Sequence, residues 1–279
     1  MTLRPLLLSI QSEVVYGHVG NGAARFALQR LGFEVLALPT VLFSNHPGHG
    51  RLKGRAIAGG ELRGLLDGLD GLGILRHCGA VLSGYLGAPA HAALVRDAVM
   101  RVRKANPKAI FACDPVFGDE GGVYARPGVD KAMARDLVPI ADIATPNRFE
   151  LAALAHMRVT DEASAIVAAR RLARPLVVAT SIPVGKKTLA TMAITPRAAW
   201  TCRVARRAHA PHGTGDLLSA LFLAHRLKGA AIPVALEKAA SGVDALIRAA
   251  ARHKTNEMPL IAAQDALTRT TATLKAIEL

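Results

Sequence analysis

The sequence predicts an α/β fold in which a central, mostly parallel β-sheet is covered by helices on both faces. Short apolar runs of strand length alternate along the chain with longer segments that carry the apolar spacing of helices. Such alternation is typical of strand–helix–strand units. No internal repeat, low-complexity tract or Ser/Gly-rich linker divides the 279 residues. We therefore predict one domain over residues 1–279.

The expected elements follow from the same spacing. Apolar runs predict buried strands at residues 5–10, 34–43, 80–87, 109–117, 141–147 and 175–181. Helical spacing predicts helices at residues 21–32, 61–69, 89–105, 148–155 and 161–173. Two of these helices have plausible starts, at Pro89 and Asp161.

The last third of the chain has a different pattern. Residues 188–196 and 198–206 predict an antiparallel pair around the turn at Pro196, so the sheet is expected to be mixed at one edge. Two helices are predicted after that pair, at 213–229 and 233–253. Near the start of the chain, residues 46–54 are the most loop-like polar segment and are a candidate lid or substrate loop.

Charge and composition limit the classes of partner. The chain has 35 Lys and Arg against 21 Asp and Glu, and the formal charge of +14 favours encounter with anions such as nucleotides, phosphates or nucleic acid. Only 4% of the residues are aromatic and none alternate with Arg, so the sequence lacks the stacking platform of nucleic-acid binders. We expect no nucleic-acid partner.

Three cysteines, Cys78, Cys113 and Cys202, are widely separated and form no Cys-x-x-Cys pair. This pattern favours buried free thiols over disulfides or a zinc knuckle. No run of about 18 uncharged apolar residues is present, and the opening residues do not resemble a signal peptide. We expect a cytoplasmic protein without a membrane segment.

The sharpest local motif is Gly213-Thr214-Gly215-Asp216, directly before an apolar helical run. Two glycines at a helix start let consecutive backbone N–H groups turn toward one point, where the helix dipole adds positive charge, so an anion is expected there. A carboxylate beside that anion is useful if it accepts a proton from a nucleophile that attacks the anion. The competing interpretation is a Gly-rich turn in which Asp216 stabilises the helix start.

Two further motifs place polar groups after predicted strands. Asp114 follows one strand and precedes a Pro and a Gly; it is expected at the strand end, where it would orient a metal or phosphate, or else lies in a surface turn. Asn147 and Glu150 lie three apart at a helix start, where their oxygens would suit Mg²⁺ held through waters. The competing interpretation of this pair is a capping box, with Glu150 reaching back to the helix cap.

Other patterns are discounted. The glycines at 17, 20 and 22 have the wrong order for a dinucleotide fingerprint, and residues 185–188 imitate only the end of a P-loop. Two histidine pairs have spacings that metal sites use, but neither has a third ligand nearby in sequence, so solvated loop histidines are expected. The pairs are His46 with His49 and His209 with His212.

Taken together, the motifs resemble ribokinase-type small-molecule kinases, and among these the vitamin B6 kinases that phosphorylate pyridoxal and pyridoxamine. The resemblance runs from about residue 5 to residue 265. It is carried by Ile10-Gln11-Ser12, Val14-Val15-Tyr16-Gly17-His18, Gly20-Asn21, Phe43-Ser44-Asn45-His46, Val81 to Gly87, Cys113-Asp114-Pro115-Val116, Pro146-Asn147 with Glu150, Gly213 to Asp216, and Ala262-Ala263-Gln264-Asp265.

The resemblance implies a ribokinase-like three-layer sandwich with an ATP site along the carboxyl edge of its sheet, and a homodimer. For the substrate it implies that Ser12 hydrogen-bonds the pyridine ring. It also implies that His46, Pro47 and Gly48, together with Tyr85, wall the substrate pocket.

For catalysis the resemblance implies that Asp216 is the general base on the 5′-hydroxyl. The N–H groups of Gly213, Thr214 and Gly215 would steady the phosphoryl group in transfer. For ATP and Mg²⁺ it implies that Asp114, Asn147 and Glu150 organise the metal and the phosphates, with Asp114 and Glu150 assigned to the metal and with Thr145 and Thr180 facing the nucleotide.

The sequence departs from the family pattern between residues 180 and 212. The region is shortened, and Arg206 or Arg207 would have to supply missing nucleotide contacts. The expected activity is ATP- and Mg²⁺-dependent phosphorylation of pyridoxal, pyridoxamine or pyridoxine in vitamin B6 salvage. The alternatives are a hydroxymethylpyrimidine kinase of the same superfamily and a pyridoxal-binding protein with weak or no kinase activity.

Overall fold

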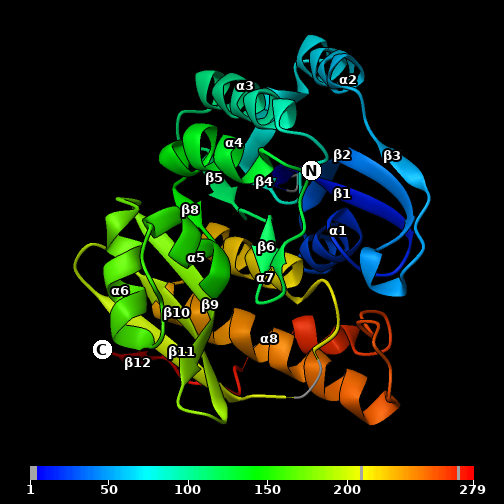
Figure 1. Cartoon of the computed structure of the whole chain (residues 1–279). Coiled ribbons are helices and arrows are strands. Elements are labelled where there is room, and N and C mark those ends of the chain that lie inside the picture. The colour runs from blue at the N-terminus through cyan, green and yellow to red at the C-terminus, as the bar shows by residue number, and fades with distance from the viewer. Residues whose placement is uncertain (1–4, 208–209, 269–270) are drawn as a thin grey trace.

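A computed structural model describes residues 5–207, 210–268 and 271–279 (Figure 1). Ten strands form one sheet in the order β12-β11-β10-β9-β8-β5-β4-β1-β2-β3. Their bounds are β1 Leu6–Tyr16, β2 Glu34–Asn45, β3 Gly54–Ala56, β4 Cys78–Ser83, β5 Ile110–Cys113, β8 Ile143–Ala144, β9 Leu176–Val184, β10 Thr188–Ile194, β11 Ala199–Ala205 and β12 Ile277–Glu278. The α-helices are α1 Asn21–Arg30, α2 Gly59–Gly71, α3 Ala90–Ala105, α4 Val129–Asp136, α5 Arg148–Ala155, α6 Glu162–Arg171, α7 Thr214–Leu227 and α8 Ile232–His253.

The centre of the sheet is parallel and both of its edges are antiparallel. The six strands from β2 to β9 pair in parallel, as predicted. Strands β10 and β11 form the predicted antiparallel pair, with Met192 opposite Thr201. At the other edge β3 pairs antiparallel with β2, which the loop-like composition of residues 46–54 does not reveal.

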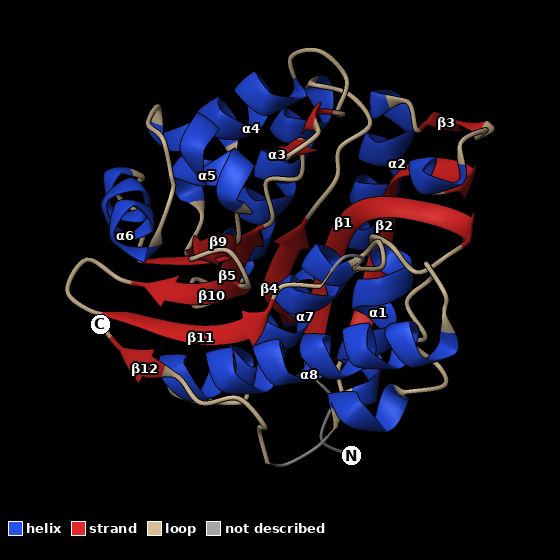
Figure 2. Ribbon diagram, turned by 60° about the horizontal axis from the view of Figure 1, so that its bottom comes forward, coloured by secondary structure: helices blue, strands red, loops and turns tan. Residues whose placement is uncertain are grey.

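Alternate residues of each central strand enter different cores, because successive side chains of a strand point to opposite faces. In β1, Leu7 packs into the core that α1, α7 and α8 cover. Its neighbour Leu8 packs into the opposite core under α2, α3 and α4. Figure 2 shows the two groups of helices on opposite sides of the sheet. Burial on both faces explains why apolar residues dominate the central strands.

Helix α7 crosses the middle of one face and is apolar on all sides. Every residue from Leu217 to His225 is buried, since the helix lies against α1 and α8 as well as the sheet. A helix that is buried all round is held rigidly by packing. Its first turn, which carries the Gly-Thr-Gly-Asp motif, is therefore fixed relative to the strands.

Some short elements lie outside the predicted set. Helix α4 has eight residues and buries only Val129, Ala132 and Met133 against the sheet side of the molecule. A two-stranded hairpin, β6 (Gly118–Asp119) and β7 (Gly122–Val123), follows β5. Strand β12 pairs with β11, far away in sequence, so nothing local signals it.

The three cysteines are free and buried, as predicted. In the part of the chain that the structure describes, no helix combines the length and the apolar character needed to cross a bilayer.

Several of the predicted functional residues lie at the carboxyl edge of the parallel strands. His46 comes directly after β2, Asp114 after β5 and Thr145 after β8, while Tyr85 lies two residues beyond β4. Open α/β sheets bind their ligands at this edge.

Candidate active site

Asp216 lies in the first turn of α7, beside the start of α1. Its Oδ2 accepts a hydrogen bond of 2.8 Å from the backbone N–H of Gly20, the residue that precedes α1. The side chain is half-buried. Burial raises the pKa of Asp216 to about 6, and the Gly20 N–H limits the rise. A carboxyl group with a pKa close to neutral is well suited to accept a proton from an alcohol.

The two glycines of the motif, Gly213 and Gly215, have different surroundings. Gly213 has a φ of +84°, and a Cβ there would lie 2.0 Å from the carbonyl oxygen of His18, so both the backbone conformation and the close packing require glycine. Gly215 is exposed and has no atom within 4 Å of the position of a Cβ. The space beside Gly215 at the N-terminus of α7 is therefore open, and an anion can bind there.

Asp114 is held by hydroxyl groups from two other elements. Ser219 Oγ donates to Asp114 Oδ2 at 3.0 Å, and the same hydroxyl contacts Thr145 Oγ1 at 2.8 Å. All three side chains are buried. Burial, and then the negative charge of Asp216, raise the pKa of Asp114 to about 7, although the hydrogen bonds from Ser219 and Thr145 lower it.

Glu150 and Asn147 form the capping box at the start of α5. Asn147 Oδ1 accepts from the Glu150 N–H at 2.9 Å, and Glu150 Oε2 accepts from the Asn147 N–H at 2.9 Å. Glu150 Oε1 also accepts from the N–H of Phe117 at 3.1 Å. Asn147 Nδ2 donates to the carbonyl oxygen of Gly118 at 2.8 Å. The pair thus fixes the chain between β5 and β6 next to Asp114.

The capping box is the interpretation that competed with a magnesium role. Both carboxylate oxygens of Glu150 are engaged by backbone N–H groups, so a cation nearby would meet Glu150 through water rather than directly. Burial, and then the charge of Asp114, raise the pKa of Glu150 well above its ordinary value.

The acidic groups of this site fit a divalent cation. Asp114, Glu150 and Asp216 form no ion pair with any basic side chain of the described residues. Negative charge that burial concentrates without a protein cation is stabilised by a bound one. Oxygen donors of this kind suit Mg²⁺.

A cavity of about 160 Å³ opens beside the first turn of α7. Thr180, Thr214 and Gly215 line it, together with Arg207 and Asp244. Arg207 contacts Asp244 at 3.4 Å, so its guanidinium is held against α8 at the cavity wall. The cavity brings Thr180, for which the resemblance implies a nucleotide contact, together with Arg207 rather than Arg206.

The predicted substrate residues come from three neighbouring strands, with Ser12 inside β1 and the others just after β2 and β4. Ser12 is buried in β1, beside a register shift, and a Cβ on Gly20 would lie 2.2 Å from its hydroxyl oxygen. Ser12 and Asp216, the predicted base, are therefore neighbours of the same glycine. Tyr85 is partly buried and its carbonyl oxygen accepts from Thr40 Oγ1 at 2.7 Å.

His46, Pro47 and Gly48 open a short turn after β2. His46 is buried, whereas Pro47 and Gly48 are exposed. A Cβ on Gly48 would lie 2.3 Å from Nε2 of His212, so the turn touches the segment that leads into α7. The structure thus brings the predicted substrate turn next to the segment that leads into the Gly213–Asp216 motif.

Two residues that the sequence analysis did not single out complete the site region. Ser219 follows Asp216 by one helical turn, and this i, i+3 spacing was the available signal. Glu257, 211 residues from His46, contacts both His46 and His49. Glu257 is therefore the third group that the pair His46 and His49 lacks nearby in sequence. The expectation that both are solvated loop histidines is wrong for His46, whose side chain is buried. His209, of the second predicted pair, lies outside the described residues.

This fold and acidic site define the class of ribokinase-like small-molecule kinases. A sequence model of the phosphomethylpyrimidine kinase family matches residues 76–260. The chain is 44% identical over 269 residues to a pyridoxal kinase of Rubrobacter xylanophilus, which covers 94% of this chain and 93% of that protein. It is 42% identical over 276 residues to a pyridoxal kinase of Deinococcus radiodurans, with 94% and 93% coverage.

Solved structures agree with these relatives. The pyridoxal kinase of Leishmania donovani in complex with ADP and pyridoxamine superimposes with a TM-score of 0.93 at 32% identity, over 99% of both chains. The chain belongs to the pyridoxal kinase family.

Proposed function

We propose that this protein transfers the γ-phosphoryl group of ATP to the 5′-hydroxymethyl group of pyridoxal, pyridoxamine or pyridoxine, with Mg²⁺, as one domain. The observation that carries the proposal is the position of Asp216. It is a half-buried carboxylate with a pKa of about 6 at the open N-terminus of α7. Relatives named as pyridoxal kinases support the choice of substrate.

The reaction needs three things from the chain. Asp216 accepts the proton of the 5′-hydroxyl as its oxygen attacks the γ-phosphorus, and ADP leaves with the former bridging oxygen. The N–H groups of residues 213–215 hold the phosphoryl oxygens through the transfer. Ser12, next to Gly20, orients the pyridine ring so that the hydroxyl faces Asp216.

Asp114 and Glu150 are the residues that would hold Mg²⁺, Glu150 through water. When bound, the ion supplies positive charge that neutralises the phosphates. Ser219 and Thr145 keep Asp114 oriented toward that position. Thr180 and Arg207 line the neighbouring cavity, where the nucleotide would bind.

Hydroxymethylpyrimidine phosphorylation is the second candidate, and the phosphomethylpyrimidine kinase family match favours it. Both acceptors carry a primary alcohol on a small heteroaromatic ring. A pyridoxal-binding protein with weak or no kinase activity is the third reading. The family resemblance also supports a homodimer located in the cytoplasm. Light scattering of the purified protein measures its molar mass and so tests the homodimer.

One experiment separates these functions. ATP consumption is measured in single-turnover and steady-state mode with pyridoxal, pyridoxamine and hydroxymethylpyrimidine in parallel, and Asp216→Asn serves as the blank. Turnover highest with a B6 vitamer and lost in the variant supports the proposal. Preference for hydroxymethylpyrimidine favours the second candidate, and vitamer binding without ATP consumption favours the third.

A further inference from the structure

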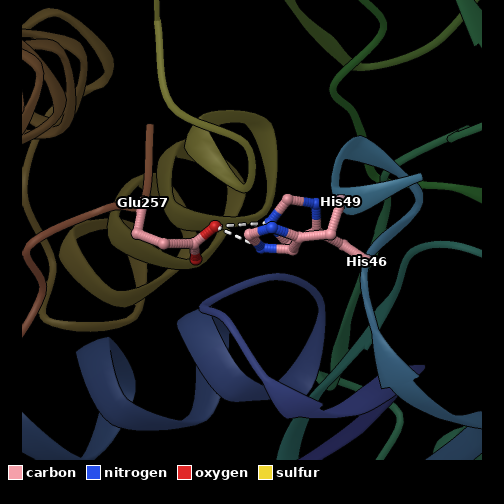
Figure 3. A group of neighbouring side chains, drawn as sticks. All are labelled: His46, His49 and Glu257. Atoms are coloured by element: carbon pink, nitrogen blue, oxygen red, sulfur yellow. Dashed lines mark hydrogen bonds and ion pairs between the residues drawn. The ribbon is translucent and has the colours of Figure 1, made fainter. Parts of the chain in front are cut away.

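Two histidines and one glutamate converge at the mouth of the site. His46 is the one of the three that is assigned to the wall of the substrate pocket, and none of them takes part in the proposed proton or phosphoryl transfer. His46 precedes the short 3₁₀ turn Pro47–His49, His49 ends it, and Glu257 follows α8 (Figure 3). Glu257 Oε1 lies 2.7 Å from Nε2 of His46 and 2.8 Å from Nε2 of His49. One donor atom from each side chain lies within 4.8 Å of the other two.

The surroundings hold this group together while leaving it open on one side. The side chain of His46 is 4% exposed, that of Glu257 20% and that of His49 34%. The three residues line a cavity of about 210 Å³ together with His212, whose ring centre is 4.5 Å from that of His46. An ion can therefore enter from solvent and still be largely enclosed.

We propose that His46, His49 and Glu257 bind a divalent transition-metal ion of the Zn²⁺ type. Two imidazole nitrogens and one carboxylate oxygen form a mixed donor set that Zn²⁺, Co²⁺ and Ni²⁺ prefer, whereas Mg²⁺ prefers oxygen donors alone. The site is thus chemically distinct from the proposed Mg²⁺ position at Asp114. Three protein ligands leave a fourth position for water.

The protons have to be rearranged when the ion binds. His46 Nδ1 accepts a hydrogen bond of 3.2 Å from the Gly48 N–H, so in the neutral ring the proton is on Nε2 and is donated to Glu257. An ion at Nε2 takes the place of that proton, which moves to Nδ1. Binding therefore breaks the Gly48 contact and joins the turn to Glu257 through the ion instead.

No other described part of the chain offers a competing set of donors. This is the one group of three His, Cys, Asp or Glu side chains with that spacing among residues 5–207, 210–268 and 271–279. The free cysteines are buried in the cores.

The test uses the full chain without a polyhistidine tag, stripped of metal. Zn²⁺ is titrated by calorimetry, and Co²⁺ by its visible absorption, in the presence of excess Mg²⁺. We expect one high-affinity equivalent and a tetrahedral Co²⁺ spectrum. At about 100 times the dissociation constant, Zn²⁺ should raise the melting temperature by roughly 5 to 10 °C.

His49→Gln and Glu257→Gln supply the decisive variants, because glutamine keeps hydrogen-bonding capacity but removes a ligand. Each should weaken Zn²⁺ binding by more than the roughly 10- to 100-fold cost of losing an outer-shell partner. His77→Gln, an exposed histidine on the short helix before β4, is the matched control and should bind as the wild type does.

Circular dichroism establishes that each variant is folded before titration, and two variants guard against the failure of one. The proposal is overturned if the wild type binds no Zn²⁺. It is equally overturned if both ligand variants, once folded, bind as tightly as His77→Gln; the cluster would then be a hydrogen-bonded latch only.

Discussion

The backbone N–H of Gly20 donates to Oδ2 of Asp216 at 2.8 Å, across 196 residues of sequence. The bond joins the starts of α1 and α7. Gly20 has a φ of +53°, and a Cβ there would collide with Ser12, so the contact depends on glycine. Gly20 thus holds the carboxylate of Asp216 through its N–H and also lies next to Ser12, the residue assigned to the pyridine ring.

Replacement of Asp216 by Asn should lower turnover by at least about a hundredfold, because the loss of a general base typically costs 10²- to 10⁴-fold. The amide oxygen can still accept the Gly20 N–H, and the change removes a carboxylate whose pKa burial raises, so the melting temperature near neutral pH should not fall below that of the wild type. Steady-state kinetics measure the loss of turnover, and a thermal melt on the same preparation measures the melting temperature. Near-normal turnover in the folded variant would remove the base role from Asp216.

Acid should inactivate the enzyme through the same carboxyl. Asp216 must be ionised to accept a proton, and its pKa is about 6, so kcat/KM should fall about tenfold per pH unit below that value. The profile is recorded with pyridoxal and with pyridoxine, whose own ionisations differ. An acid limb that moves with the substrate would show that the vitamer, not Asp216, is titrating.

The ionised carboxylate of Asp114 should lower the free energy of unfolding above neutral pH. Its pKa in the folded chain, about 7, lies above its ordinary value of 3.8, so the folded protein takes up a proton that the unfolded chain does not hold between these values. Stability therefore rises as pH falls through 7. Asp114→Asn removes the buried charge, while its amide oxygen still accepts from Ser219.

We expect Asp114→Asn to melt about 2 to 4 °C higher than the wild type at pH 8, which corresponds to about 1 kcal/mol in a domain of similar size. The difference should shrink at pH 5. Thermal melts at the two pH values measure it. A lower melting temperature at both values would mean that the carboxylate is stabilised by its surroundings rather than strained by them.

Ser219 should act on Asp114 rather than on the substrate. Ser219→Ala removes a hydrogen bond that lowers the pKa of Asp114, and it also removes the contact between Ser219 and Thr145. We expect turnover at pH 7 to fall about tenfold, with recovery toward alkaline pH, and a loss of about 1 to 2 kcal/mol of stability.

Ser241→Ala is the matched control for Ser219→Ala. Ser241 is also a buried helix serine, and its hydroxyl accepts the N–H groups of Thr273 and Leu274. It should lose similar stability without any change in the pH profile. If both variants show the same profile, Ser219 contributes only to packing.

Replacement by alanine should lower stability at Gly213 but not at Gly215, the two glycines of the turn before Asp216. Gly213→Ala places a methyl group 2.0 Å from the His18 carbonyl in a left-handed conformation, so we expect it to lose at least about 2 kcal/mol of stability. Gly215→Ala meets no neighbour and should fold normally, but its methyl group narrows the space in front of the helix N-terminus and should raise the KM for ATP. Thermal melts and ATP titrations compare them; a stable Gly213→Ala would contradict the packing argument.

Much of the fold is readable from periodicity. The central strands are long apolar runs because both faces are buried, and the helices between them have a clear apolar stripe. Strands β3 and β12 escaped prediction because each is two or three residues long and depends on a distant partner for its pairing. That all 279 residues form one domain stays a prediction.

The site was predictable where the chemistry is local. The turn before Asp216 and the pair Asn147 with Glu150 are short motifs, and the spacing of that pair predicts the capping box as one of two interpretations. The contacts of Ser219 with Asp114 and of Glu257 with His46 join residues 105 and 211 positions apart. No local pattern encodes such contacts, because the packing of α7 and of the segment after α8 creates them.

The residues assigned to catalysis leave the ribosome at different times, because they lie far apart along the chain. Asp114 and Glu150 belong to the first 150 residues, whereas Asp216 arrives on α7, a helix that is buried on every side. A ribosome-bound chain that has emerged only as far as α6 carries the acidic groups assigned to the metal but no base. By the proposed mechanism, phosphoryl transfer has to wait until α7 has been synthesised and has docked, so a chain that ends before α7 cannot consume ATP by this route.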